Sequence, residues 1–161
     1  MIIKFTETEI SILDYIAHLR YRETSKKAKE QKQDLSKNSR DIVRHGVYTE
    51  YAAAKHINVF FDLNCDYRKF GADLVTWKGT KVDVKSTISS GGPINARKNS
   101  VSKPADIFIC TEVDDANGEV KIIGYIERDE LLQDANLHDI GNGPYYSLPQ
   151  TYLKKLNGFK Y

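Results

Sequence analysis

Residues 71–87 read GADLVTWKGTKVDVKST, and this stretch decides the fold class. It falls within two strand-like runs, at 70–77 and 80–87, whose Val, Thr, Phe and Trp residues suit a pleated, half-buried surface. The dipeptide Lys78-Gly79 between the runs is a turn signal. We therefore predict a β-hairpin here, and with it a sheet in the domain.

The second run of this hairpin places two charged side chains on one face. Side chains alternate across a strand, so Asp83 and Lys85 point to the same side. A loop with an odd number of residues would bring Asp73 opposite Asp83 or Lys85 on that face, whereas a two-residue loop would place it opposite Val84. The sequence permits a cluster of two carboxylates and one ammonium without requiring it.

Such a cluster favours a functional role. Desolvated charges need excellent pairing merely to break even, so a charged cluster at a sheet edge is a poor way to stabilise a fold. Paired carboxylates suit Mg²⁺, which prefers one or two carboxylates together with substrate phosphates. A nearby lysine can orient the attacking water or stabilise charge developing at phosphorus. The alternative is that Asp83 and Lys85 form the solvated side of an amphipathic hairpin.

The rest of the chain predicts an α/β domain with a mixed sheet. Thr6 and Glu9 form a capping-box pattern, and helically spaced apolar residues follow up to Tyr21, which predicts a long N-terminal helix continuing through Lys37. The other predicted elements are a helix at 47–57, strands at 58–61, 105–111 and 119–126, a mobile loop at 88–104, a short helix at 127–135 and an irregular return at 139–149.

With its elements in this order, the chain resembles the PD-(D/E)XK nuclease superfamily. That family carries an acid on the first strand of a hairpin and an acid-x-Lys sequence on the second, here Asp73 and Asp83-Val84-Lys85. Many members direct a glutamate from the preceding helix at the site, and Glu50 resembles it; the alternative is an ordinary exposed helix residue. Ala72 replaces the proline that usually precedes the first acid. The resemblance covers about residues 46–126.

The resemblance implies a restriction-endonuclease-like core with a central mixed β-sheet flanked by helices. In this interpretation 1–161 is a single nuclease domain, with 46–126 as its catalytic core and 1–45 as a basic helical N-terminal extension. The implied activity is Mg²⁺-dependent cleavage of DNA by in-line attack of a metal-activated water, leaving a 5′-phosphate, and Mn²⁺ is expected to substitute for Mg²⁺.

The same resemblance assigns roles to the candidate site residues. Asp73, Asp83 and Glu50 are the expected metal ligands, and the Val84 carbonyl is a further one. Lys85 is expected to position the nucleophile. Glu50, Asp73, Asp83 and Lys85 together form the expected catalytic set.

Basic side chains gather in the first two thirds of the chain. Residues 1–103 carry 19 Lys and Arg against 12 Asp and Glu, whereas residues 104–161 carry 5 against 10. The excess is either a solvated helix face or a surface that binds DNA phosphates. The candidate nucleic-acid-binding residues are Arg20, Arg22, Lys26, Lys27, Lys29, Lys32, Lys37, Arg40, Arg44, Arg97, Lys98 and Lys103.

Length and composition exclude several other classes of protein. The chain has 161 residues, 40% hydrophobic and 29% charged, which suits one folded domain and excludes wholesale disorder. No apolar run is long enough to span a membrane, and the N-terminus does not read as a signal peptide, so we expect an intracellular, cytoplasmic protein. Cys65 and Cys110 match neither a disulfide framework nor a zinc spacing and are expected to be reduced, buried thiols.

The leading functional interpretation is thus a DNA endonuclease, structure-selective in the manner of a phage-type Holliday-junction resolvase and active as a homodimer. A site-specific endonuclease of restriction or homing type is the nearest alternative, and an exonuclease is the third. A different class is a catalytically inactive nucleic-acid-binding protein on the same fold. We expect no small-molecule cofactor.

Overall fold

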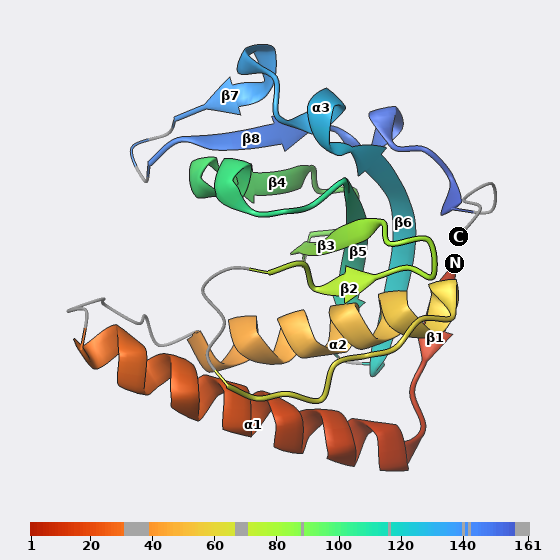
Figure 1. The fold of residues 1–161 in the computed structure, drawn as a ribbon. Coiled ribbons are helices and arrows are strands. Elements are labelled where there is room, and N and C mark those ends of the chain that lie inside the picture. The colour runs from red at the N-terminus through yellow and green to blue at the C-terminus, as the bar shows by residue number, and fades with distance from the viewer. Residues whose placement is uncertain are drawn as a thin grey trace.

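The computed structural model of the chain has an α/β fold in which helices flank a mixed five-stranded sheet (Figure 1). It describes residues 1–30, 39–66, 71–87, 89–115, 117–139, 141 and 143–156. The predicted α/β class with a mixed, helix-flanked sheet is confirmed. No helix in the described part of the chain is long and apolar enough to span a membrane.

The five-stranded sheet determines where the charged residues lie. Across the sheet its strands are β1 (Ile2–Lys4), β6 (Glu119–Glu127), β5 (Ile107–Asp114), β3 (Lys81–Thr87) and β2 (Leu74–Val75). β3 and β5 are parallel, and the other neighbouring pairs are antiparallel. β5 is buried over most of its length at the centre of the sheet, as its continuous apolar sequence predicts.

The predicted hairpin is confirmed as the antiparallel pair β2 and β3. Its register leaves a loop of residues 76–80, so the number of residues in the loop is odd. Pairing continues one residue beyond β2, where the Asp73 N–H donates to the Val82 carbonyl oxygen at 2.9 Å. Asp73 is thus hydrogen-bonded to β3 at Val82 and, through its carboxyl group, at Val84, the two neighbours of Asp83. Gly79 has a φ of 83° in the turn, a conformation open to glycine at little cost.

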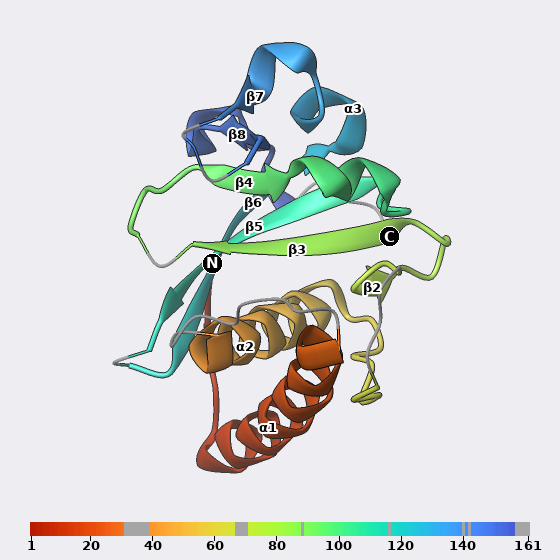
Figure 2. The same ribbon diagram turned by 90° about the vertical axis from the view of Figure 1, so that its left-hand side faces the viewer.

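Helices α1 (Glu7–Glu30) and α2 (Ser39–Ile57) lie on one face of the sheet (Figure 2). The predicted capping box of α1 is confirmed: the Thr6 N–H donates to Glu9 Oε2 at 2.8 Å, and the Glu9 N–H donates to Thr6 Oγ1 at 3.2 Å. The predicted continuation of this helix falls on residues 31–38, outside the described residues. α2 begins at Ser39, earlier than its predicted start at residue 47.

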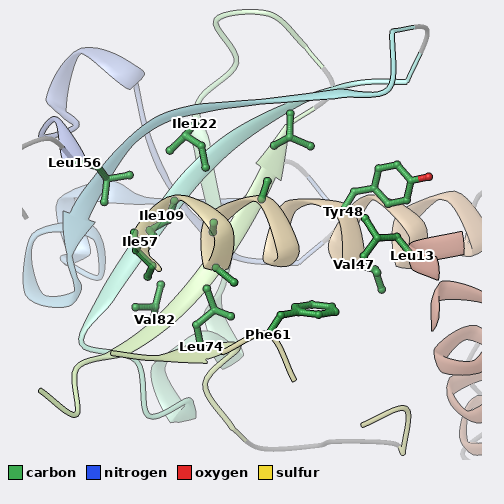
Figure 3. Packing of buried hydrophobic residues seen from close by; sticks show 14 of the residues in the cluster. Leu13, Val47, Tyr48, Ile57, Phe61, Leu74, Val82, Ile109, Ile122 and Leu156 are labelled. Atoms are coloured by element: carbon green, nitrogen blue, oxygen red, sulfur yellow. The ribbon is translucent and has the colours of Figure 1, made fainter. Parts of the chain in front are cut away.

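The main core lies between these helices and the sheet (Figure 3). Ala52, Ala53 and Ala54 of α2 are fully buried, and their small side chains allow the helix to lie close to β3 and β5. Leu13 of α1 is buried in the same core. The N-terminal helix is thus packed into the domain along the part that carries its apolar stripe.

The opposite face of the sheet is covered by a second, three-stranded sheet of order β4-β8-β7, with bounds Ile94–Arg97, Tyr145–Leu148 and Leu137–His138, and by the short helix α3 (Arg128–Leu131). The predictions of a loop at 88–104 and of an irregular return at 139–149 were therefore wrong in secondary structure. These segments contain β4, a 3₁₀ helix at Lys98–Ser102, and β8. Short strands rich in Asn, Ser and Tyr have no clear local signal, and they form by pairing with each other.

Two other local predictions differ from the structure. Residues 58–61 are not a strand: Asn58, at a φ of 52°, ends α2 in a left-handed cap, and the Val59 N–H donates to the Ala54 carbonyl at 3.0 Å. The predicted helix at 127–135 is limited to α3 and a 3₁₀ turn at Asp134–Asn136. Cys110 is a buried free thiol as predicted, whereas the free thiol of Cys65 is only half-buried.

Candidate active site

Asp83 is the centre of the candidate site. Its side chain has no exposed surface, and the Lys103 Nζ lies 2.9 Å from Oδ1. The Lys85 ammonium forms an ion pair with Oδ2, although no described residue donates a well-oriented hydrogen bond to that oxygen. Asp83 is therefore not part of a solvated hairpin face. Burial opposes ionisation of this carboxyl, but the two ammonium groups outweigh burial and lower its pKa.

Asp73 lies at the edge of the sheet, where β2 begins. Its Oδ2 accepts a hydrogen bond from the Val84 N–H at 2.7 Å, so its carboxylate takes the place of a strand carbonyl in the hairpin. Burial, followed by the negative charges of Asp83 and Glu50, raises the pKa of Asp73 to about 8. At neutral pH this carboxyl therefore holds its proton for most of the time.

Glu50 approaches from α2. Arg20 of α1 donates to Glu50 Oε2 at 2.6 Å and to the Asp62 carbonyl at 2.7 Å, which fixes the glutamate beside α1. Glu50, Asp73 and Lys103 line one cleft of about 360 Å³ between the helices and the edge of the sheet. Glu50 is therefore not an ordinary exposed helix residue.

The four predicted catalytic residues meet at the sheet edge but do not share one face. Asp83 and Lys85 pair with Phe108 and Cys110 of β5, whose side chains belong to the core under the second sheet. Glu50 lies on the opposite, helical side, and Asp73 is at the edge between them. Among the described residues, no three or more His, Cys, Asp or Glu side chains converge closely enough to hold a metal ion.

Lys103 was assigned to DNA binding from the sequence, and the structure places it within the carboxylate cluster. Burial opposes its charge, but Asp83, Asp73 and Glu50 together raise the pKa of its ammonium. It lies just beyond the 3₁₀ helix that follows β4. Sequence reasoning could not place it there, because the parallel pairing of β3 with β5 brings this segment to the site.

Most of the other candidate DNA-binding residues lie away from the cleft. Arg44 donates to Asp14 at 2.7 Å and to Asp115 at 3.1 Å, and Arg40 lies over the Tyr21 ring. Lys26 and Arg22 both pair with Glu23. Arg97 and Lys98 are exposed on β4 and the 3₁₀ helix. Lys27 and Lys29 belong to α1, at positions whose side chains are not described, and Lys32 and Lys37 lie outside the described residues.

Comparison of the chain with known protein families, curated proteins and solved structures found no match.

Proposed function

We propose that the protein is a Mg²⁺-dependent DNA endonuclease. One observation carries the proposal: the fully buried Asp83 and the half-buried Asp73, which precedes β2, lie with Lys85 and Lys103 at the edge of the sheet. A buried cluster of this kind costs stability. Strongly perturbed carboxyls beside a cleft are typical of catalytic sites.

Two features of the cluster suit a divalent cation. Oδ2 of Asp83 is buried and pairs with the Lys85 ammonium without a well-oriented donor among the described residues. The pKa of Asp73 is raised by burial and then by the negative charges of Asp83 and Glu50, which a bound cation would offset. Asp73 and Asp83 would hold the metal, with the Val84 carbonyl as a further ligand, and Glu50 would hold a metal-bound water. When bound, Mg²⁺ would lower the pKa of a bound water and neutralise charge at the phosphate.

The basic side chains would position the attacking water and hold the DNA. Lys85, half-buried on the same face of β3 as Asp83, would orient the nucleophilic water and stabilise negative charge on the phosphate oxygens. Its ammonium is held between Asp83 and the Phe108 ring, 5.9 Å from the ring centroid, which fixes its position. The basic residues of α1 and of the segment at 97–103 would hold the DNA backbone, a contribution that is independent of sequence.

The substrate we propose is branched DNA, cut by a homodimer in the manner of a Holliday-junction resolvase. The test incubates the protein with supercoiled plasmid, linear duplex and a synthetic four-way junction, each in Mg²⁺, Mn²⁺, Ca²⁺ or EDTA. We expect cleavage in Mg²⁺ and Mn²⁺, preferring the junction, and none in EDTA. Ca²⁺ should support binding without turnover, because its longer and looser coordination positions water badly.

Point variants connect any cleavage to this site. Asp83→Ala and Lys85→Ala should each lower the cleavage rate by at least about 100-fold, the usual scale for losing a catalytic group. Lys81→Ala, an exposed position on the same strand, is the matched control and should cleave at the wild-type rate.

The outcome of the cleavage assay distinguishes the proposed function from its alternatives. Equal cleavage in EDTA would rule out the metal-dependent mechanism. Cleavage of one duplex sequence in preference to the junction would favour a site-specific endonuclease. Tight DNA binding without cleavage in any metal would favour an inactive binding protein.

A further inference from the structure

Lys103 has an unusual position for a DNA-binding lysine. Its Nζ lies 2.9 Å from the fully buried Oδ1 of Asp83, while its side chain is 34% exposed and lines the cleft. The ammonium therefore lies at the boundary between the buried carboxylates and the space where a substrate would lie. Lys85, the other cation on Asp83, is held instead over the Phe108 ring.

The backbone that carries Lys103 is fixed from another element. Arg128, the first residue of α3, donates from Nη1 to the carbonyls of Lys103 at 2.8 Å and Ala105 at 3.2 Å, and from Nη2 to the carbonyl of Val101. Three backbone acceptors in five residues are thus held by one guanidinium. Any movement of the Lys103 ammonium is therefore expected to come from its flexible side chain.

The site around the cleft already holds as many cationic groups as carboxyl groups. Glu50, Asp73 and Asp83 supply three carboxyls, and Arg20, Lys85 and Lys103 supply three cations. A divalent cation at Asp83 would add two positive charges within a few ångströms of two ammonium groups, where repulsion is screened little. The repulsion falls most readily if the ammonium that lines the cleft moves away.

We propose that Lys103 is a displaceable counter-cation: it neutralises Asp83 in the metal-free protein, and a divalent cation bound by Asp83 and Asp73 releases its ammonium into the cleft to bind a substrate phosphate. The inference rests on the proposed metal-dependent function. In this proposal Lys103 weakens metal binding while the cleft is empty and contacts a substrate phosphate when the cleft is filled.

The test measures binding of Mg²⁺ alone by isothermal titration calorimetry, without DNA. Lys103→Met should bind Mg²⁺ about tenfold or more tightly than the wild type, because a like charge is removed from beside the site. Lys103→Arg retains the charge and should bind with nearly wild-type affinity. Lys78→Met removes an exposed lysine from the turn between β2 and β3, a position without an assigned role, and is the control.

The outcomes separate this inference from the proposed function. If the wild type binds Mg²⁺ and Lys103→Met binds it no more tightly, the counter-cation role is wrong and the proposed nuclease still stands. If neither protein binds Mg²⁺, both ideas are wrong.

Removing Lys103 leaves Asp83 with one partner, so Lys103→Met is first checked for folding by circular dichroism. If it does not fold, the test uses NMR of the wild-type protein and follows the side-chain ¹⁵N resonance of Lys103. This resonance is assigned by its absence in Lys103→Arg. Saturating Mg²⁺ should shift this resonance towards that of a solvated ammonium. An unchanged resonance in the Mg²⁺-bound protein would overturn the proposal.

Discussion

The carboxyl group of Asp73 is expected to destabilise the fold although the proposed function requires it. In the unfolded chain it ionises freely, whereas in the fold desolvation and the nearby charges of Asp83 and Glu50 raise its pKa to about 8. We expect Asp73→Asn to be more stable than the wild type at pH 7 in EDTA by at least about 1 kcal/mol, or roughly 2–4 °C in Tm. The amide oxygen can still accept the Val84 hydrogen bond, and cleavage should be lost.

Thermal unfolding in EDTA checks this expectation, with Asp41→Asn, an exposed position on α2, as the control. A less stable Asp73→Asn protein would show that the carboxylate contributes to the fold and would weaken the case for a functional site.

Some of the individual residues of the candidate site could be placed from the sequence alone. Strand alternation was enough to put Asp83 and Lys85 on one face. Whether Asp73 would lie near them stayed open, because the sequence did not fix the number of residues in the hairpin loop. The partners Arg20 and Lys103 could not be assigned in this way, because their positions depend on helix packing and on the pairing of distant strands.

Among the elements, the start of α1 allows a quantitative test. Glu9 accepts hydrogen bonds from the Thr6 N–H at 2.8 Å, the Tyr51 hydroxyl at 2.6 Å and the Lys55 ammonium at 2.6 Å. Burial opposes ionisation, but these donors outweigh it and lower the pKa of Glu9 to about 2. We expect Glu9→Gln to reduce the free energy of unfolding at pH 7 by about 1–2 kcal/mol.

The pH dependence of this loss has a definite sign. Because the folded pKa lies below the unfolded one of 4.5, the stabilisation is complete above pH 4.5 and disappears as the pH falls towards 2. Urea unfolding of both proteins at pH 7, 4 and 2 measures the difference. Glu7→Gln, exposed in the first turn of the same helix, is the control. A difference that stays constant with pH would contradict an ionised Glu9.

Gly124 in β6 marks a close approach between elements. A Cβ atom at this position would lie 2.5 Å from the carbonyl oxygen of Lys154, in the segment that bridges to Tyr125. We expect Gly124→Ala to destabilise the protein by about 1–3 kcal/mol, the usual cost of overpacking. Gly46→Ala in α2, where the nearest atom is 4.0 Å away, should instead be neutral or stabilising. Equal stabilities of the two variants in urea would contradict this difference.

The elements found from the sequence have strong local signals. The capping box, the alanine-rich part of α2, the hairpin and the buried run of β5 were all predicted before any tertiary contact was known. The missed elements β1, β4 and β8 are short, and each is formed by pairing with a strand distant in sequence. The end of α2 was misjudged because an apolar sequence follows Asn58, although Phe61 packs into the core without forming a strand.

For the molecule as a whole, the proposed DNA path can be tested through its salt dependence. If Lys26, Lys27, Lys29 and Lys32 contact phosphates, changing all four to Ala should reduce the slope of log K against log salt by up to about 3–4 units on duplex DNA. Thermal stability should change little, because in the sequence these lysines follow the helically spaced apolar residues, which end at Tyr21.

A charge-matched control changes Lys4, Lys78, Lys81 and Lys155, which lie on other exposed parts of the surface. The comparison is made by fluorescence anisotropy from low to moderate salt, where long-range attraction is not yet screened. An unchanged slope in the first variant would mean that the end of α1 is only a solvated face, and DNA would then have to lie over Arg97, Lys98 and Lys103.

The hydrogen bond from the Val84 amide to Asp73 makes one backbone proton a spectroscopic reporter of the site. This amide has a side-chain carboxyl as its acceptor in the sheet, so its resonance depends on the charge of Asp73. A cation arriving at Asp73 would withdraw electron density from that acceptor and shift the signal of a single, sequentially assignable residue. Occupancy of the cleft could therefore be followed residue by residue in a protein that is not turning over any substrate.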